Sequence, residues 1–168
     1  MIGLLLGAVG VFVGYVIAAC AIVGGVPYSL SATYYRLTEK VWFGVSMCAS
    51  AALLLPIVAS LGTANYAGFL ACGALMFVGL APNFRMGGLE HTVHMSGAIS
   101  CIVFSQVYVA LNSPLWLLTW APLAAYIIIQ GIRKGEDFNF VKDCKPMFWT
   151  EICALVSFVG VLFGLNLK

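Results

Sequence analysis

The sequence predicts an all-α integral membrane protein, in which a bundle of six transmembrane helices forms a single domain over residues 1–168. The chain is 62% hydrophobic and only 8% charged, whereas soluble domains carry about 25% charged residues. Its mean hydropathy is +1.04. The apolar residues fall into six runs of roughly 18–23 residues, the length that a helix needs to cross the hydrocarbon layer. These runs lack the alternation of a membrane β-barrel, so helices are favoured.

The predicted helices, in chain order, are Ile2–Gly24, Val41–Leu61, Ala64–Ala81, Thr92–Leu111, Pro114–Ile132 and Met147–Leu165. The first has no Lys or Arg before it, so it lacks the basic region of a signal peptide and is expected to be retained. Pro56 and Pro122 lie inside their runs and predict kinks, because each removes a backbone hydrogen bond. Pro114 and Pro146 are instead placed to begin helices.

The first predicted helix carries a stripe of glycines. Their spacing of three and four residues puts them on one helical face, where a second helix can approach closely. Two interpretations remain open: the stripe packs against another helix of the same chain, or it forms the interface of a homo-oligomer. The stripe consists of Gly3, Gly7, Gly10 and Gly14.

The basic residues predict how the chain is oriented. Seven of the eight Lys and Arg residues follow the first, third or fifth helix, and only Lys168 lies at the other end. The seven are Arg36, Lys40, Arg85, Arg133, Lys134, Lys142 and Lys145. Because cytoplasmic loops are enriched in Lys and Arg, these loops are predicted to be cytoplasmic and both termini non-cytoplasmic. No polar domain carries a basic patch, which argues against binding of nucleic acid.

Polar side chains that could bind a ligand or take part in a reaction lie at the predicted cytoplasmic end of the bundle. Because polar groups near hydrocarbon are costly without partners, we expect them to converge on one ligand-binding cavity at the cytoplasmic end. The small residues Ala98, Cys101 and Ser105 continue the histidine face of the fourth helix, and we expect this face to point into the bundle. The expected site residues are Ser31, Arg36, Arg85, Glu90, His91, His94 and Glu151.

This set of residues supports several functional hypotheses. The leading one is a protein without enzymatic activity that binds a lipid headgroup or a small anion through Arg36 and Arg85. A second is a metal-dependent membrane hydrolase, with zinc or iron held by His91, His94 and Glu90, or acid–base chemistry at the histidines. A third is a small transporter, although of the acids only Glu151 approaches the membrane interior, where transport sites usually lie. The sequence leaves open whether the protein is an enzyme, and it identifies no catalytic residue.

One segment resembles a known family. The stretch VPYSLSATYYRLTEKVWF at residues 26–43, with Pro27, Ser29, Ser31 and Trp42, and the VHMSGA around His94 are similar to segments of the damage-regulated autophagy modulators and their bacterial relatives of unknown function. The resemblance implies six membrane helices and, through the bacterial members, a bacterial inner membrane. It implies no enzymatic activity. The alkaline-ceramidase-like hydrolases need three histidines, whereas this chain has two.

Overall fold

The computed structural model describes residues 1–134 and 144–167, and this part of the chain is helical throughout its regular structure, with no strand. Six α-helices are joined by loops that include three 3₁₀-helices: η1 (Ser31–Tyr35), η2 (Phe84–Met86) and η3 (Pro114–Trp120). The α-helices are α1 (Ile2–Val23), α2 (Val41–Ser60), α3 (Asn65–Leu80), α4 (Gly88–Asn112), α5 (Ala121–Lys134) and α7 (Pro146–Asn166).

Five helical segments are long and apolar enough to cross a membrane, which supports the predicted class of a multi-pass membrane protein. One of them combines η3 with most of α5, over Pro114–Arg133, while α3 is shorter, with 16 residues. The predicted boundaries agree with the observed ones to within one or two residues for most helices. The larger differences are at α4, which begins at Gly88 instead of Thr92, and at the fifth predicted helix, where η3 covers Pro114–Trp120 and α5 begins at Ala121. Gly87 and Gly88 both have positive φ, so the turn ends there and the helix starts directly after it.

Two of the four prolines lie as the sequence predicts, and two differ from the prediction. Pro56 lies inside α2, and Pro146 occupies the first turn of α7. Pro114 begins η3 instead of an α-helix. Pro122 was expected to kink the middle of a helix, but it is the second residue of α5. There its missing N–H falls among the first-turn groups that have no helical partner, so Pro122 marks the junction between η3 and α5.

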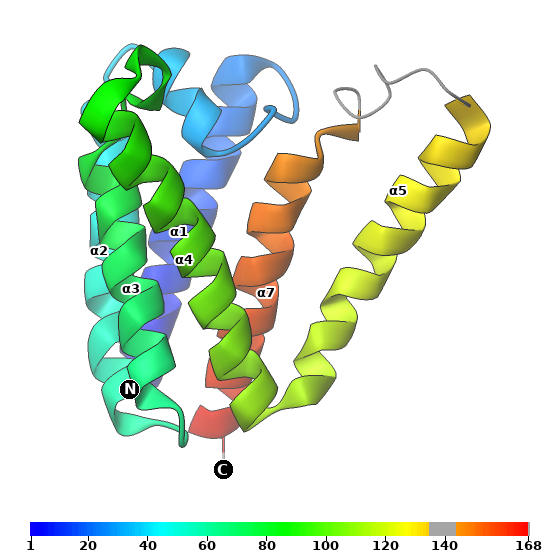
Figure 1. The fold of residues 1–168 in the computed structure, drawn as a ribbon. Coiled ribbons are helices and arrows are strands. Elements are labelled where there is room, and N and C mark those ends of the chain that lie inside the picture. The colour runs from blue at the N-terminus through cyan, green and yellow to red at the C-terminus, as the bar shows by residue number, and fades with distance from the viewer. Residues whose placement is uncertain (135–143, 168) are drawn as a thin grey trace.

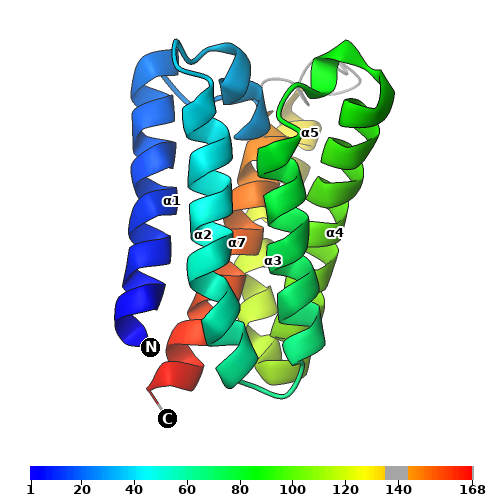
Figure 2. The same cartoon turned by 90° about the vertical axis from the view of Figure 1, so that its left-hand side faces the viewer.

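Five helices, α1, α2, α3, α4 and α7, form the bundle, and α5 lies to one side of it (Figure 1). Both termini lie at one end of the bundle, as an even number of predicted membrane crossings requires (Figures 1 and 2). The loops that follow α1 and α3 lie at the opposite end. This second end is called the loop end below. Two of the basic residues from which the orientation is predicted, Lys142 and Lys168, lie outside the described residues.

Two hydrophobic clusters hold the bundle together. The cluster nearer the termini contains Leu5, Ile57, Tyr108 and Leu162 among others. The cluster nearer the loop end centres on aromatic residues of α1, α2 and α7, including Phe12, Tyr15, Phe43 and Phe148.

Helices α2 and α3 touch through glycines. A Cβ added at Gly44 would lie 2.7 Å from the carbonyl oxygen of Gly79, so only glycine permits this approach. The predicted stripe on α1 behaves differently. A Cβ added at Gly3, Gly10 or Gly14 would meet no atom within 4 Å, and one at Gly7 would make only an ordinary contact with Leu53. The stripe faces outward, so packing within the chain does not account for it.

A candidate ligand cavity within the bundle

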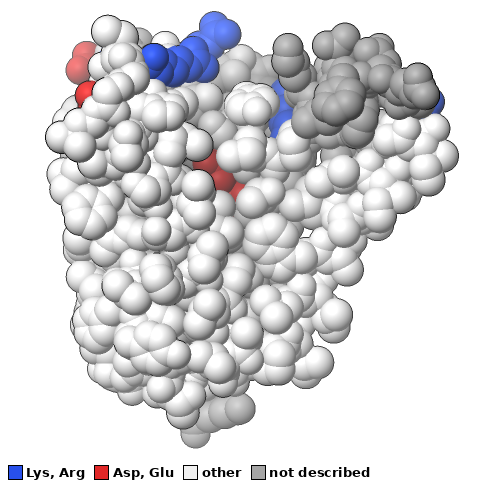
Figure 3. Space-filling view, viewed as in Figure 1, with Lys and Arg blue, Asp and Glu red and all other residues white. Residues whose placement is uncertain are grey.

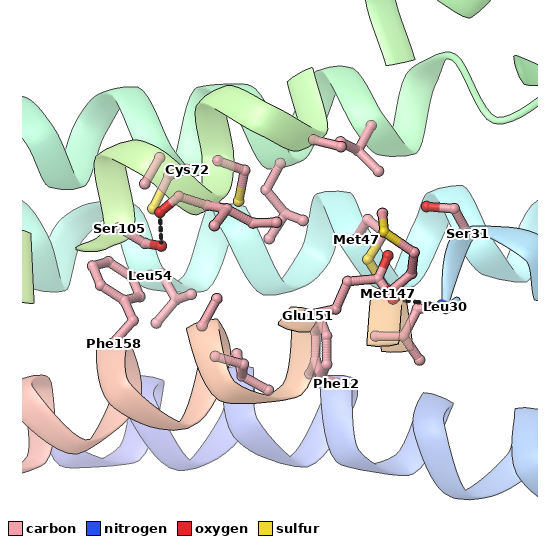
Figure 4. A pocket seen from close by; sticks show the side chains of 18 of the residues that line it. Phe12, Leu30, Ser31, Met47, Leu54, Cys72, Ser105, Met147, Glu151 and Phe158 are labelled. Atoms are coloured by element: carbon pink, nitrogen blue, oxygen red, sulfur yellow. Dashed lines mark hydrogen bonds between the residues drawn. The ribbon is translucent and has the colours of Figure 1, made fainter. Parts of the chain in front are cut away.

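The bundle contains a cavity of about 120 Å³ between α1, α2, α3, α4 and α7. On this measure a single water needs only roughly 10–15 Å³. The walls are aliphatic, aromatic or small side chains, and they extend from the loop end to the middle of the bundle (Figure 4). Ala98, Cys101 and Ser105 line one side of the cavity, as their spacing predicts. Only one residue of the lining, Glu151, is charged.

Glu151 is held at the end of the cavity nearest the loops. Its Oε2 accepts a hydrogen bond from the backbone N–H of Leu30, with a nitrogen–oxygen distance of 2.6 Å (Figure 4). Two further bonds join the start of α7 to the same loop: Phe148 N–H donates to the Tyr28 carbonyl at 3.1 Å, and the Lys145 ammonium donates to the Val26 carbonyl. The α1–α2 loop therefore lies across the first turn of α7 and fixes the direction of its carboxylate.

The α1–α2 loop is itself held by buried hydroxyl groups. Ser29 Oγ accepts from the Ala32 N–H at 3.0 Å, and Thr33 Oγ donates to the Leu30 carbonyl at 2.5 Å. The Tyr15 hydroxyl is also bonded to Thr33 Oγ. Because the Thr33 proton is already committed to Leu30, Tyr15 is the donor of that bond. These contacts bury Ser29, Ser31 and Thr33 and place Ser31 in the cavity lining beside Glu151.

The histidine segment stabilises a loop instead of lining the cavity. His94 is 2% exposed, its Nδ1 lies 2.8 Å from the Ala81 carbonyl oxygen, and its ring stacks on Phe84 with the ring centres 4.6 Å apart. His91 Nδ1 lies 2.7 Å from the Phe84 carbonyl oxygen. Since a carbonyl can only accept, both rings carry their proton on Nδ1. Glu90 accepts from the Asn83 N–H at 2.9 Å, so these three side chains all bind the turn before α4.

The two arginines lie at the surface of the loop end. Arg85 is exposed, with its guanidinium carbon 4.4 Å from the centre of the Tyr35 ring. Its backbone N–H donates to the Tyr35 hydroxyl at 2.7 Å. Arg36 is exposed as well. Neither arginine belongs to the cavity lining.

The structure thus brings together only two of the seven expected site residues. Ser31 and Glu151 line the cavity, and Arg36, Arg85, Glu90, His91 and His94 do not. The expected metal ligands are also not assembled: within residues 1–134 and 144–167, no group of three His, Cys, Asp or Glu side chains could hold an ion. His91, His94 and Glu90 instead satisfy separate backbone groups of one turn.

A polar network that the sequence analysis did not single out lies deeper in the bundle. Gln106 of α4 accepts from the Trp120 indole N–H at 2.9 Å and from Ser157 Oγ at 3.0 Å. Its amide nitrogen lies 3.2 Å from Ser105 Oγ and 3.3 Å from the Ala154 carbonyl oxygen. This network joins η3 to α4 and α7 close to the inner part of the cavity. The only sequence signal was an amide within an apolar run.

The cavity can be reached from outside. Glu151 is only partly buried, and Figure 3 shows acidic atoms within a hollow on the face that carries α4 and α7 in Figure 1. Basic side chains lie above this hollow, at the loop end. The candidate site is therefore an apolar cavity that opens on the side of the bundle, with one carboxylate near the opening.

Comparison of the chain with protein-family models, with curated proteins and with solved structures gave no match. The resemblance to the damage-regulated autophagy modulators therefore stays a prediction from the residues at 26–43 and around His94.

Proposed function

We propose that this protein is a multi-pass membrane protein that binds a lipid-like molecule, with its hydrocarbon chain in the bundle cavity and its polar end beside Glu151. The observation that carries the proposal is the apolar cavity of about 120 Å³ with a single charged residue at one end. The apolar lining offers dispersion contacts to a hydrocarbon chain, and a membrane supplies such chains. The proposal is one of binding and includes no chemical step.

The proposed orientation follows the basic residues. The described cations that follow the first, third or fifth predicted helix are Arg36, Lys40, Arg85, Arg133 and Lys145, and cytoplasmic loops are enriched in such residues. The loop end then faces the cytoplasm and both termini lie on the other side, in the inner membrane of a bacterium. In this orientation the opening of the cavity lies near the cytoplasmic leaflet.

The ligand differs from the headgroup or anion that the sequence favours. The arginines expected to bind an anion are exposed and lie apart from the cavity lining. A metal-dependent hydrolase gains no support either, because its expected ligands hold a backbone turn. The geometry instead supports binding of an amphiphile from the side of the bundle.

The cavity can be tested by filling it. Ala154 is buried in the lining on α7, and Ala154→Phe should remove space for a ligand. Val156 lies two residues away and is 46% exposed, so Val156→Phe adds the same ring outside. The purified proteins are labelled with a photoreactive long-chain alkane, and labelled residues are located by mass spectrometry.

We expect labelling at lining residues such as Cys101 and Leu155 in the unchanged protein and in Val156→Phe, and its loss in Ala154→Phe. If Ala154→Phe does not fold, Cys101→Phe fills the cavity from the opposite wall and replaces it. Labelling confined to outward-facing residues would contradict the proposal.

A further inference from the structure

We propose that the polar end of the ligand is an ammonium group, so that the cavity selects a single-chain amphiphilic amine through the carboxylate of Glu151. This inference rests on the proposed function, because it assumes that the cavity holds an amphiphile. It replaces the anionic ligand expected from sequence with a ligand of opposite charge.

The described lining of the cavity carries a single acidic side chain. Glu151 is the one charged residue among the nineteen described residues that line the cavity, and no Lys, Arg or His is among those nineteen. An acid at this depth is costly unless it is paired or hydrated. Lys145, the cation nearest in sequence, donates its ammonium to the Val26 carbonyl. A cationic ligand would supply the partner that the described lining of the cavity lacks.

The charge of the ligand headgroup decides whether the Glu151 carboxylate attracts or repels it. Beside an ionised Glu151, an anionic headgroup would add a second negative charge, in surroundings where charges interact more strongly than in water. An ammonium group would meet an opposite charge and donate hydrogen bonds to it, and such charge-assisted bonds are shorter and stronger than neutral ones. The carboxylate therefore discriminates against fatty acids and phospholipid phosphates and favours amines.

The α1–α2 loop already orients the carboxylate of Glu151. The Leu30 N–H binds Oε2 at 2.6 Å, while a carboxylate has about four acceptor positions on its two oxygens. The Ser31 N–H also bonds to the carboxyl group, and these two donors fix it without exhausting its capacity. The Ser31 side chain lies in the lining beside it, where its hydroxyl can accept a bond from an ammonium. These groups form a polar end of fixed geometry.

The cavity is elongated along the bundle and small in volume. The cavity extends from Glu151 and Met147 at the loop end to Leu54, Ser105 and Phe158 deeper in the bundle (Figure 4). Its volume is about 120 Å³. An apolar cavity of about 150 Å³ holds a molecule of the size of benzene, so this cavity is too small for two long chains. A short single chain with a small headgroup fits this size, and the partly exposed Glu151 leaves the headgroup at the opening.

The experiment uses three photoreactive probes with the same alkyl chain, which end in an ammonium, a carboxylate or a hydroxyl group. The full-length protein is purified in a non-ionic detergent and labelled with each probe. Two variants are compared. Glu151→Gln removes the charge but keeps an oxygen that can accept from Leu30, and Glu90→Gln removes a carboxylate outside the cavity lining.

We expect the ammonium probe to label lining residues at least about ten-fold more than the carboxylate probe. Glu151→Gln should abolish this ratio, and Glu90→Gln should keep it. If all three probes label the lining equally, or the carboxylate probe labels it best, the ammonium inference is wrong while the proposed cavity stands. If no probe labels the lining, the proposed function itself is wrong. If Glu151→Gln does not fold, competition of the ammonium probe by unlabelled alkylamine against unlabelled fatty acid decides the same question.

Discussion

The imidazole of His94 stacks on the phenyl ring of Phe84, with the ring centres 4.6 Å apart and the planes 20° from parallel. The ring nitrogen of the same histidine binds the carbonyl of Ala81, so one side chain holds both ends of the short segment between α3 and η2. A histidine that the sequence suggests as a metal ligand or proton carrier is thus a buried structural part of the connection between α3 and α4.

Replacement of His94 should therefore destabilise the protein more than replacement of its neighbour. His94→Ala removes a fully buried ring and leaves the Ala81 carbonyl without its donor, at a cost of about 3 kcal/mol. His91 is exposed and makes one bond, to the Phe84 carbonyl, so His91→Ala should cost about 1 kcal/mol. Thermal unfolding of the purified variants in detergent measures the difference. Equal losses in Tm would show that the buried stack contributes little.

A second prediction compares two glycines of α7. A Cβ added at Gly160 would lie 2.4 Å from carbon atoms of the Trp116 ring, whereas one at Gly164 would meet no atom within 4 Å. Gly160→Ala should push η3 away and destabilise the protein by about 1–3 kcal/mol. Gly164→Ala should be neutral or stabilising by up to about 1 kcal/mol, because alanine favours helices. Unfolding midpoints of both variants, with tryptophan fluorescence as the signal, test the pair.

The glycines on the outer face of α1 lead to a third prediction, which follows the proposal that they form a homo-oligomer interface. Gly10→Leu should leave the fold of one chain intact, because a side chain there enters open space. It should disrupt close contact between two copies of α1. Cross-linking in membranes and light scattering in detergent measure the oligomeric state. The proposal fails if the unchanged protein is monomeric in both, or if Gly10→Leu associates as the unchanged protein does.

The fourth prediction concerns orientation. Lys40 is exposed at the loop end, and Thr63 is exposed in the turn between α2 and α3, which lies at the end of the bundle that carries the termini. In intact bacterial spheroplasts, Thr63→Cys should react with a membrane-impermeant maleimide, and Lys40→Cys should react only after lysis. The unchanged protein, with its six native cysteines, provides the background. The reverse pattern would place the loop end outside the cytoplasm.

Much of the fold was predictable because the physical constraint is local. A run such as Val41–Leu61 must form a helix if it lies in hydrocarbon, since its backbone groups have no other partners there. Its predicted limits accordingly match α2, Val41–Ser60, closely. The inward direction of Ala98, Cys101 and Ser105 followed from helical spacing in the same way.

The grouping of the polar residues could not be predicted in this way. Sequence places Glu90, His91, His94, Arg85 and Glu151 at one end of the bundle, but the depth and direction of each side chain depend on how the loops fold. Two turns decide the outcome. The turn before α4 uses Glu90, His91 and His94 for its own backbone groups, and the α1–α2 loop brings Leu30 to Glu151. Both depend on contacts between distant segments.

By itself, the sequence determined the helical class, the positions of the helices and the end at which polar groups gather, because hydrophobic length and helical spacing are properties of short segments. Only the tertiary structure decided that the glycines of α1 face outward, that Pro122 lies in the first turn of a helix and that the bundle contains a largely apolar cavity whose described lining has Glu151 as its one charged residue. A cavity arises where several helices fail to fill the space between them, and no single segment of the chain specifies how much space the others leave.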